Sequence, residues 1–349
     1  EVLAQLELAA SSKTFRPEGS KLSQQNEQEF IKVRVEKTAS LRQKGIDPYP
    51  TSYKRTHTSR QAEEAFEVAE KTNKEFTETI KVAGRIMGRR GMGKASFIDL
   101  SDTDGRIQVM LRSNVLNEDY EILDDLDIGD WIGAEGTLFR TRTGQITLQV
   151  ATFSILCKSL RPLPEKWHGL TDVETRFRQR YLDLISNEDA IKTAKDRSLL
   201  VSTIRQFMTK KGFIEVETPM LVPIAAGGMA HPFTTHHNAL NRDLYLRIAT
   251  ELHLKRLVVG GIEKVFEIGR VFRNEGVDLQ HNPEFTTLES YEAFSDYNDV
   301  MSMVEQLVST AATTLNGSET VKYGEEELKF SPPWPRIDLR EKIIEVSGI

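Results

Sequence analysis

Charged side chains gather in one segment whose ends alternate like the two strands of a hairpin, RVFRNEGVDLQHNPEFTTLESYE at residues 270–292. Successive side chains of a strand point to opposite faces of its sheet. One face of the expected hairpin therefore takes the apolar side chains Phe266, Ile268 and Leu288. The opposite face gathers charged and aromatic side chains, namely Glu267, Arg273, Phe285, Glu289 and Tyr291.

These side-chain types suit a ligand that carries both signs of charge and a planar ring. An arginine fork binds a carboxylate or a phosphate through two parallel hydrogen bonds. A carboxylate such as Glu289 beside the Tyr291 phenol can hold an ammonium group, and the Phe285 ring offers a stacking surface for a base. We interpret this face as a ligand pocket. The alternative, a solvated sheet edge, stays open on these residues alone.

Composition indicates an ordinary globular protein, with 39% apolar and 28% charged residues among 349. This length suits two or more domains. There is no run of about 18 apolar residues, so no membrane span is expected. The single cysteine, Cys157, excludes a disulfide within the chain and fits a reducing compartment, so we expect a cytoplasmic location.

The charge distribution says more than the net charge of −6, which by itself does not indicate nucleic-acid binding. Five basic residues and no acidic residue lie between Lys81 and Lys94. A local basic face can bind phosphates on a protein that is acidic overall. On charge alone, a solvated surface explains this cluster equally well.

The N-terminal part predicts helices followed by a small barrel. Polar helices are expected over residues 28–44 and 59–71, after a loosely held arm. Period-two alternation then predicts five short strands, over residues 80–87, 97–100, 106–111, 131–138 and 145–156. Five such strands suggest a barrel of the oligonucleotide-binding (OB) type.

The C-terminal part predicts a mixed α/β domain on an antiparallel sheet flanked by helices. Helices are expected from Glu188, over residues 251–259 and over residues 297–315. The resulting domain prediction is an N-terminal arm and helical extension at 1–75, the barrel at 76–160, a linker at 161–174 and the second domain at 175–349. The segment GRRGMGK at residues 88–94 nearly matches a phosphate-binding P-loop, but Ala95 and a strand follow it, so we predict a hairpin there.

Several of these segments resemble one enzyme family. The segment FRNEGVDLQHNPEFTTLESYEAF at 272–294 is similar to motif 2 of class II lysyl-tRNA synthetases, and KKGFIEVETPML at 210–221 is similar to motif 1. The resemblance runs from about Gln28 to the last residue. It implies an α+β multidomain protein, with an OB-fold anticodon-binding barrel followed by a class II catalytic domain. It also implies lysine–tRNA ligation in protein biosynthesis, through a lysyl-adenylate made from L-lysine and ATP.

The resemblance assigns roles to individual residues. Arg273 is expected to bind the α-phosphate of ATP and the lysine carboxylate, stabilising the transition state. The other expected ATP-binding residues are Glu275, His281, Asn282 and Phe285, with Phe285 stacked under adenine. The other expected lysine-binding residues are Gly227, Glu251, Glu289 and Tyr291. Of these, Glu251 is expected to hold the α-ammonium group, and Glu289 and Tyr291 the ε-ammonium group.

Partners of the protein are also implied. Arg85, Phe97 and Gln108 point away from the barrel core by alternation and are expected to form a stacking and hydrogen-bonding face. In the family this face binds the anticodon of tRNA(Lys). A lone surface aromatic is the alternative for Phe97. Pro219 is expected at a homodimer interface.

The resemblance also shows where the chain departs from the family. Motif 3 and the acidic ligands of Mg²⁺ have no counterpart before Ile349, so we expect a catalytic domain that is C-terminally incomplete, with no metal ligand in this chain. A catalytically incomplete tRNA-binding or regulatory relative is the alternative. Departures at Ala226, His231 and Thr250 lie in and near the expected lysine loop.

Overall fold

The structure, a computed structural model, describes residues 21–164, 170–278 and 280–348. The chain divides into two compact units, residues 1–191 and 192–349, which are described separately below. Most of the predicted arm and the middle of the predicted linker lie outside the described residues. The finer domain boundaries near residues 75, 160 and 174 stay predictions.

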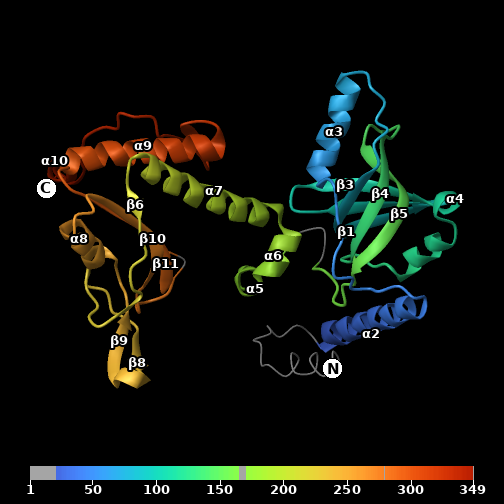
Figure 1. Cartoon of the computed structure of the whole chain (residues 1–349), viewed down its shortest axis with the longest axis horizontal. Helices are drawn as coiled ribbons and strands as arrows, with labels where there is room; N and C mark the ends of the chain where they lie inside the picture. Colours follow the sequence, from blue (N-terminus) through green and yellow to red (C-terminus); the bar gives the residue numbers. More distant parts are fainter. Residues whose placement is uncertain (1–20, 165–169, 279, 349) are drawn as a thin grey trace. The chain divides into compact units, whose positions relative to one another are not determined.

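Five strands of the first unit close into a barrel in the order β1-β2-β3-β5-β4 (Figure 1). Their bounds are β1 Ile80–Met92, β2 Ala95–Ser101, β3 Arg106–Arg112, β4 Trp131–Arg140 and β5 Ile146–Cys157. All pairs are antiparallel except β3 with β5, which is parallel. This is the predicted OB fold, and the P-loop-like segment is the predicted hairpin between β1 and β2.

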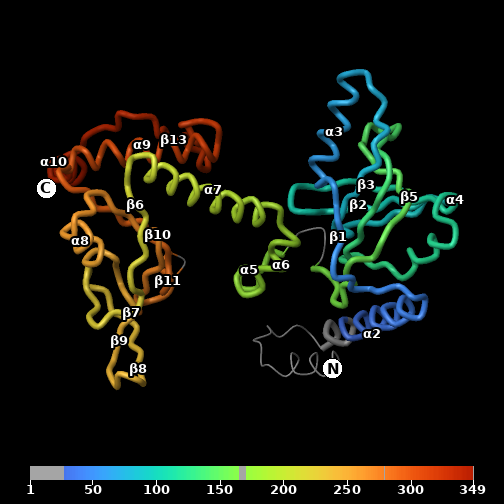
Figure 2. Tube along the Cα trace, viewed as in Figure 1, coloured from blue at the N-terminus to red at the C-terminus, as the bar shows by residue number. Residues whose placement is uncertain are grey.

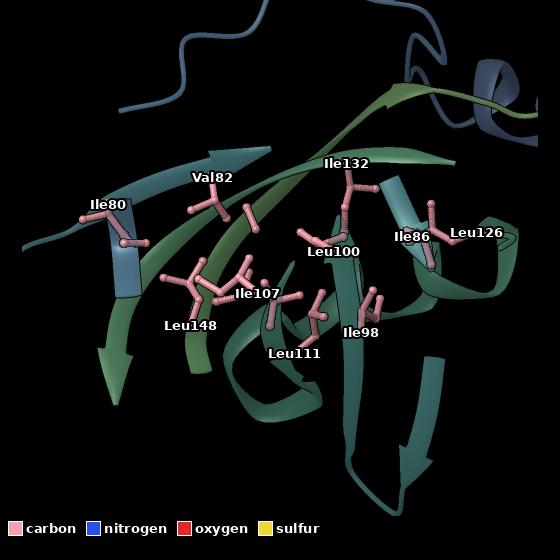
Figure 3. Packing of buried hydrophobic residues seen from close by; sticks show 14 of the residues in the cluster. Ile80, Val82, Ile86, Ile98, Leu100, Ile107, Leu111, Leu126, Ile132 and Leu148 are labelled. Carbon is pink, nitrogen blue, oxygen red and sulfur yellow. The ribbon is translucent and has the colours of Figure 1, made fainter. Parts of the chain in front are cut away.

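Alternating aliphatic side chains fill the barrel. Ile80, Val82 and Ile86 of β1 are buried, as are Ile98 and Leu100 of β2. Figure 3 shows these side chains pointing toward Ile107, Leu111, Ile132 and Leu148 from the other strands. The period of two that predicted the strands is therefore the period of core burial.

Two longer helices pack on the barrel. Helix α3 (Ser59–Lys71) begins with a capping box between Thr58 and Gln61 and buries Ala62 and Phe66. Helix α2 (Lys21–Gln43) is mostly polar; it buries Leu41 in the barrel core, and its charged side chains bind the barrel. Lys37 Nζ lies 2.8 Å from Asp127 Oδ1, and Arg34 Nη1 donates to the carbonyl of Ser159 at 2.7 Å. Between β3 and β4 the chain forms a short helix, α4 (Ser113–Leu116), and a 3-10 helix, η1 (Asn117–Asp125).

A buried ion cluster closes the end of the barrel near α2. Lys158 and Asp130 side chains are both 0% exposed, and Lys158 Nζ donates to Asp130 Oδ2 at 2.6 Å. The same ammonium group donates to Asp127 Oδ2 at 2.8 Å and to the carbonyl of Asp125 at 2.6 Å. All three donor positions of this side chain therefore find acceptors inside the protein.

Helices α5 (Val173–Arg178), α6 (Arg180–Ser186) and α7 (Glu188–Lys210) follow, and α7 runs from the first unit into the second. The main sheet of the second unit has the order β11-β10-β6, with β6 Ile214–Glu215, β10 Lys264–Phe272 and β11 Glu284–Glu292. The pair β10–β11 is the predicted hairpin, and β6 pairs with β10 in parallel.

The remaining elements surround this sheet. A second sheet has the order β7-β9-β8, and its β8–β9 hairpin projects from the rest of the second unit (Figure 2). Its strands are β7 Leu221–Val222, β8 Thr234–His237 and β9 Arg242–Leu246, with η2 (Asn238–Leu240) between β8 and β9. Helices α8 (Glu251–Val259), α9 (Tyr297–Asn316) and α10 (Leu339–Ser347) and the pair β12 (Thr320–Tyr323) with β13 (Glu326–Lys329) complete the unit.

Candidate functional site

The β10–β11 hairpin has the two unlike faces that the sequence predicts. Phe266 is fully buried against Met208 and Phe213, and Ile268 and Leu288 pack on the same cluster. The register pairs Val265 with Tyr291, Glu267 with Glu289, Gly269 with Thr287 and Val271 with Phe285. These pairs lie on the face opposite the apolar cluster. We call this face the charged face of the hairpin.

Glu267 departs from the role of an open ligand group. It is only 4% exposed and forms an ion pair with Arg247, which is 1% exposed. The other carboxylate oxygen of Glu267 accepts from Thr218 Oγ1 at 2.6 Å. Both oxygens are therefore committed inside the protein, so the prediction that Glu267 belongs to an open ligand face is wrong. A side chain from a distant segment, just after β9, covers it, which alternation cannot reveal.

Glu289 and Glu251 supply two carboxylates at the beginning of α8. Glu289 accepts a hydrogen bond from the backbone N–H of Thr250 at 3.2 Å. Glu251 is the first residue of α8, and a Cβ on Gly227 would lie 3.4 Å from its Cβ and 2.8 Å from Ala249 Cβ. Gly227 also has φ +93°, which favours glycine. Close approach and backbone conformation both require glycine here, so the loop backbone lies directly beside Glu251.

Tyr291 lies within the field of these carboxylates. Burial, together with the charges of Glu251 and Glu289, raises the pKa of its phenol to about 12. The ammonium group of Lys255 pairs with Glu251 and lies 5.8 Å from the centre of the Tyr291 ring. An ammonium group of the chain itself thus contacts two of the residues predicted to bind lysine. The structure brings Gly227, Glu251, Glu289 and Tyr291 together on this face.

Arg273 and Phe285 form the other end of the charged face. The Arg273 guanidinium lies 5.3 Å from the centre of the Phe285 ring, and the side chain is exposed. The backbone N–H of Arg273 donates to the carbonyl of Pro283 at 2.9 Å, which closes the base of the connecting loop. A flat ligand could stack on this ring while the guanidinium binds an anion.

The loop between β10 and β11 carries the other predicted ATP-binding residues. Glu275, His281 and Asn282 are all exposed. Asp278 accepts from the backbone N–H of Gln280 at 2.7 Å and of His281 at 2.8 Å, and its carboxylate lies 2.8 Å from His281 Nδ1. These hydrogen bonds hold the pKa of Asp278 below its usual value. Asp278 thus holds Gln280 and His281 in place, and it is a residue that sequence reasoning did not single out.

The three departures from the family pattern have definite positions. Thr250, at the N-cap of α8, is 1% exposed and donates its backbone N–H to Glu289. The carbonyl of His231 accepts from the backbone N–H of Asn274 at 2.7 Å, so the loop before β8 is tied to the loop after Arg273. Ala226 precedes the close contact at Gly227. Pro219 is exposed between β6 and β7, and its place at a dimer interface stays a prediction.

On the barrel, the predicted nucleic-acid face is arranged differently from the expectation. Register pairs Phe97 with Arg90 on one side and with Met110 on the other. A β-bulge between Ile86 and Gly88 reverses the alternation after Arg85, so Arg90 joins the face of Phe97. Arg90 Nη2 lies 3.0 Å from Asp99 Oδ1 and remains largely exposed. Arg90 is the basic residue of this face that strict alternation missed.

Arg85 is committed elsewhere. Its Nη1 donates to the carbonyl of Gly129 at 2.8 Å, and its guanidinium lies 5.1 Å from the centre of the Trp131 ring. Burial lowers the pKa of this guanidinium. Arg85 pairs with Ser101, four residues along β2 from Phe97. The structure therefore does not bring Arg85 beside Phe97.

Gln108 points away from the barrel core but is not open. It is 7% exposed, and its side-chain carbonyl accepts from Thr147 Oγ1 at 3.0 Å. The parallel pairing of β3 with β5 places Thr147 directly beside it. The expectation of an open surface glutamine is wrong for this reason. Phe97, half-buried, remains the ring available on this face.

No helix among the described residues is long and apolar enough to cross a membrane. Within the same residues, no group of three or more His, Cys, Asp or Glu side chains is placed to hold a metal ion.

Comparisons with known proteins agree with both units. Residues 172–349, just over half of the chain, match the family model described as tRNA synthetases class II (D, K and N). Residues 80–162 match the OB-fold nucleic acid binding domain. Proteins named lysine–tRNA ligase are similar over most of the chain. The identity is 54% to that of Dehalococcoides mccartyi over 90% of this chain and 64% of the relative. It is 51% to that of Carboxydothermus hydrogenoformans, over 92% and 65% of the two chains.

The chain thus spans a little under two thirds of the length of these relatives. The family match covers the unit that carries the charged face of the hairpin, and the OB-fold match covers the barrel that carries Phe97. The chain belongs to the class II tRNA synthetases of the D, K and N group.

Proposed function

We propose that this protein ligates L-lysine to tRNA(Lys) in the cytoplasm, using ATP and passing through lysyl-adenylate. The observation that carries the proposal is the grouping of Gly227, Glu251, Glu289 and Tyr291 at one end of the charged face. Two carboxylates and a phenol suit a ligand with two ammonium groups. Relatives about half identical in sequence are named lysine–tRNA ligases, which supports lysine as that ligand.

Amino-acid selection follows from charge. Glu251, at the N-terminus of α8, takes the α-ammonium group with help from the backbone at Gly227. Glu289 and Tyr291 take the ε-ammonium group. An amino acid with an apolar side chain leaves the Glu289 carboxylate without a partner. One with an acidic side chain brings a second negative charge next to it. A partly buried carboxylate therefore favours lysine over uncharged amino acids of similar length.

Activation of lysine is a matter of position and electrostatics. Arg273 binds the lysine carboxylate and the α-phosphate, and Phe285 stacks under adenine, with Glu275, His281 and Asn282 on the adjoining loop. A carboxylate oxygen attacks the α-phosphorus, and pyrophosphate leaves. Arg273 stabilises the negative charge that shifts in the transition state. A ribose hydroxyl of the tRNA then attacks the adenylate carbonyl, and AMP leaves.

Magnesium accompanies ATP in this class of reaction and neutralises phosphate charge. The described residues contain no metal-holding group, so none of them is assigned to Mg²⁺. The barrel is proposed to bind the anticodon through Phe97 and its neighbours, and Pro219 to lie at a homodimer interface.

Amino-acid-dependent exchange of pyrophosphate into ATP tests the activation step. The protein is expressed from its full reading frame and assayed with each of the standard amino acids and MgATP. We expect exchange with lysine and background rates with the other amino acids. Exchange with a different amino acid would contradict lysine activation. Tight tRNA binding without any exchange would indicate the non-catalytic alternative.

A further inference from the structure

Three buried polar atoms near Glu289 have no hydrogen-bond partner among the residues that the structure describes. They are Arg247 Nη2, Thr250 Oγ1 and Thr287 Oγ1. Buried polar groups are nearly always satisfied, by protein or by ordered water. Three such atoms on neighbouring residues indicate a shared partner.

Arg247 extends across the charged face, and its other donors are all used. Nε donates to the carbonyl of Arg270 at 2.8 Å, and Nη1 to the carbonyl and Oγ1 of Thr218 at 3.1 and 3.0 Å. Nη1 also pairs with Glu267. A Cβ built on Gly269 would lie 2.4 Å from Nη2, so Nη2 lies directly over Gly269. Glycine at this position leaves room for the guanidinium.

The register places Thr287 beside the glycine that Nη2 covers. Gly269 pairs with Thr287 across the hairpin, and Glu267 pairs with Glu289 in the adjacent row of the same face. The guanidinium therefore spans both rows. Thr250 approaches from α8, because its backbone N–H donates to Glu289 Oε1 at 3.2 Å. The three orphan atoms thus belong to residues next to Glu289 or its register partner Glu267. Thr250 bonds to Glu289, Thr287 lies two residues away on the same face, and Arg247 pairs with Glu267.

The chemistry of these atoms selects the missing partner. Arg247 Nη2 can only donate, whereas the threonine hydroxyls can donate or accept. A bound ammonium group can also only donate, so it cannot satisfy Arg247. The Arg247 charge is already balanced by Glu267, which favours a neutral acceptor over an anion. A water molecule accepts from Nη2 and still has two protons to donate.

We propose that Arg247, Thr250 and Thr287 bind a buried water molecule beneath Glu289. The water accepts from Arg247 Nη2 and from the Thr250 hydroxyl, and it donates to Thr287 Oγ1 and to the Glu289 carboxylate. It holds that carboxylate toward the ε-ammonium group of bound lysine, a consequence that rests on the proposed function. Thr287 and Arg247 are therefore positioning residues, which act on lysine through the water and Glu289.

Two variants of one position, with a matched control, test this site. Thr287→Val keeps the shape and removes the hydroxyl, whereas Thr287→Ser keeps the hydroxyl. Thr286→Val makes the same change on the opposite face of the same strand. All three are measured in lysine-dependent ATP–pyrophosphate exchange with the full-length protein, after thermal unfolding shows that each is folded.

We expect Thr287→Val to raise the KM for lysine by about tenfold. The variant loses the water, and with it the hydrogen bond from the water to the charged Glu289 carboxylate. The KM for ATP stays unchanged, and Thr287→Ser and Thr286→Val behave like the wild type. A general packing defect would change both KM values or affect both valine variants. An unchanged lysine KM in Thr287→Val would overturn the positioning role.

A crystal structure of the lysine-free protein tests the water itself, independently of activity. We expect density for one water within hydrogen-bond distance of Arg247 Nη2 and Thr287 Oγ1, and none there in Thr287→Val. An empty site, or an anion shown by anomalous scattering in bromide, overturns the proposal. If the water is present but no lysine-dependent exchange is detected, the proposed function fails and the water site stands.

Discussion

Glu267 and Glu289 face each other in register across β10 and β11, yet their carboxylates are held in opposite ways. Glu267 is closed off by Arg247 and Thr218, whereas Glu289 accepts from the backbone N–H of Thr250. Two carboxylates side by side repel each other unless one is neutralised. The Arg247 ion pair neutralises Glu267, so Glu289 can serve as the anion that meets a bound ammonium group.

Glu289→Gln removes that anion while keeping the side-chain shape. We expect the kcat/KM for lysine to fall about 10- to 100-fold, since a hydrogen bond to a charged group contributes about 1.5–3 kcal/mol. ATP–pyrophosphate exchange at varied lysine concentrations measures this. The matched control is Glu284→Gln, on the same strand but the opposite face, where Glu284 pairs with Arg270 at 3.3 Å. Equal losses in the two variants would contradict a lysine-binding role for Glu289.

Tyr291 gives a prediction on pH. Its pKa is raised to about 12, above the value of about 10 for a free phenol. The folded protein therefore holds this proton when the unfolded chain has lost it. The stability linked to Tyr291 is fully present below about pH 10 and is lost as pH rises toward 12. Ultraviolet difference titration of wild type and Tyr291→Phe isolates the phenol. We expect Glu289→Gln to lower this pKa, because the variant removes a neighbouring negative charge; no change would contradict the assigned cause.

Variants of Arg90 and Arg85 are expected to affect different properties, nucleic-acid binding for Arg90 and barrel stability for Arg85. Arg90 is largely exposed and is the register partner of Phe97 on the same face. Arg90→Ala should therefore weaken tRNA binding, and the number of counterions released on binding should fall by about one. Arg85 is held by Gly129 and Trp131, so Arg85→Ala should chiefly lower the thermal stability of the barrel. Filter binding at several salt concentrations and thermal unfolding of both variants check this. The reverse pattern would show that Arg85, not Arg90, contacts the nucleic acid.

Phe97→Ala should weaken tRNA binding by about 5- to 150-fold, the range expected when one aromatic–base stack worth about 1–3 kcal/mol is lost. Lysine-dependent ATP–pyrophosphate exchange should be unchanged, because tRNA takes no part in activation. Phe97→Tyr keeps a stacking ring and serves as the control. If Phe97→Ala binds tRNA as tightly as the wild type, Phe97 does not stack on a base, and the alternative of a lone surface aromatic holds.

Lys158 tests the buried ion cluster of the barrel. Lys158→Met leaves Asp130 buried without its cation, and breaking such a pair costs about 3–5 kcal/mol of unfolding free energy. Lys71→Met breaks an exposed pair with Glu67 at 3.7 Å and should cost about 0–1 kcal/mol. Denaturant unfolding measures both. A similar small loss in the two variants would contradict a stabilising role for the buried Lys158–Asp130 pair.

The sequence was sufficient where structure follows from local periodicity. Helices α3 and α8 have the predicted bounds, and the five strands occupy the predicted segments. Strict alternation of burial holds for most of β1 and for β2, whereas β3 is buried on both faces. The two faces of the β10–β11 hairpin were also predicted from alternation. The resemblance to class II lysyl-tRNA synthetases agrees with the family match over residues 172–349.

The errors arose where a distant segment decides a residue's surroundings. Alternation gave the face of Glu267 correctly, but only the fold brings Arg247 over it. Gln108 faces away from the core, but Thr147 of a strand distant in sequence covers it. The bulge between Ile86 and Gly88 has no clear sequence signature, and it exchanges the faces of Arg89 and Arg90.

Transfer of labelled lysine to tRNA tests the central claim most directly. The full-length protein is incubated with MgATP, labelled lysine and a tRNA(Lys) transcript, beside the same transcript with an altered anticodon. The account predicts acid-precipitable lysyl-tRNA with the lysine anticodon, much less with the altered one, and almost none in Glu289→Gln at low lysine concentration. Failure to charge tRNA(Lys) with lysine, under conditions in which the protein is folded and binds ATP, would contradict it.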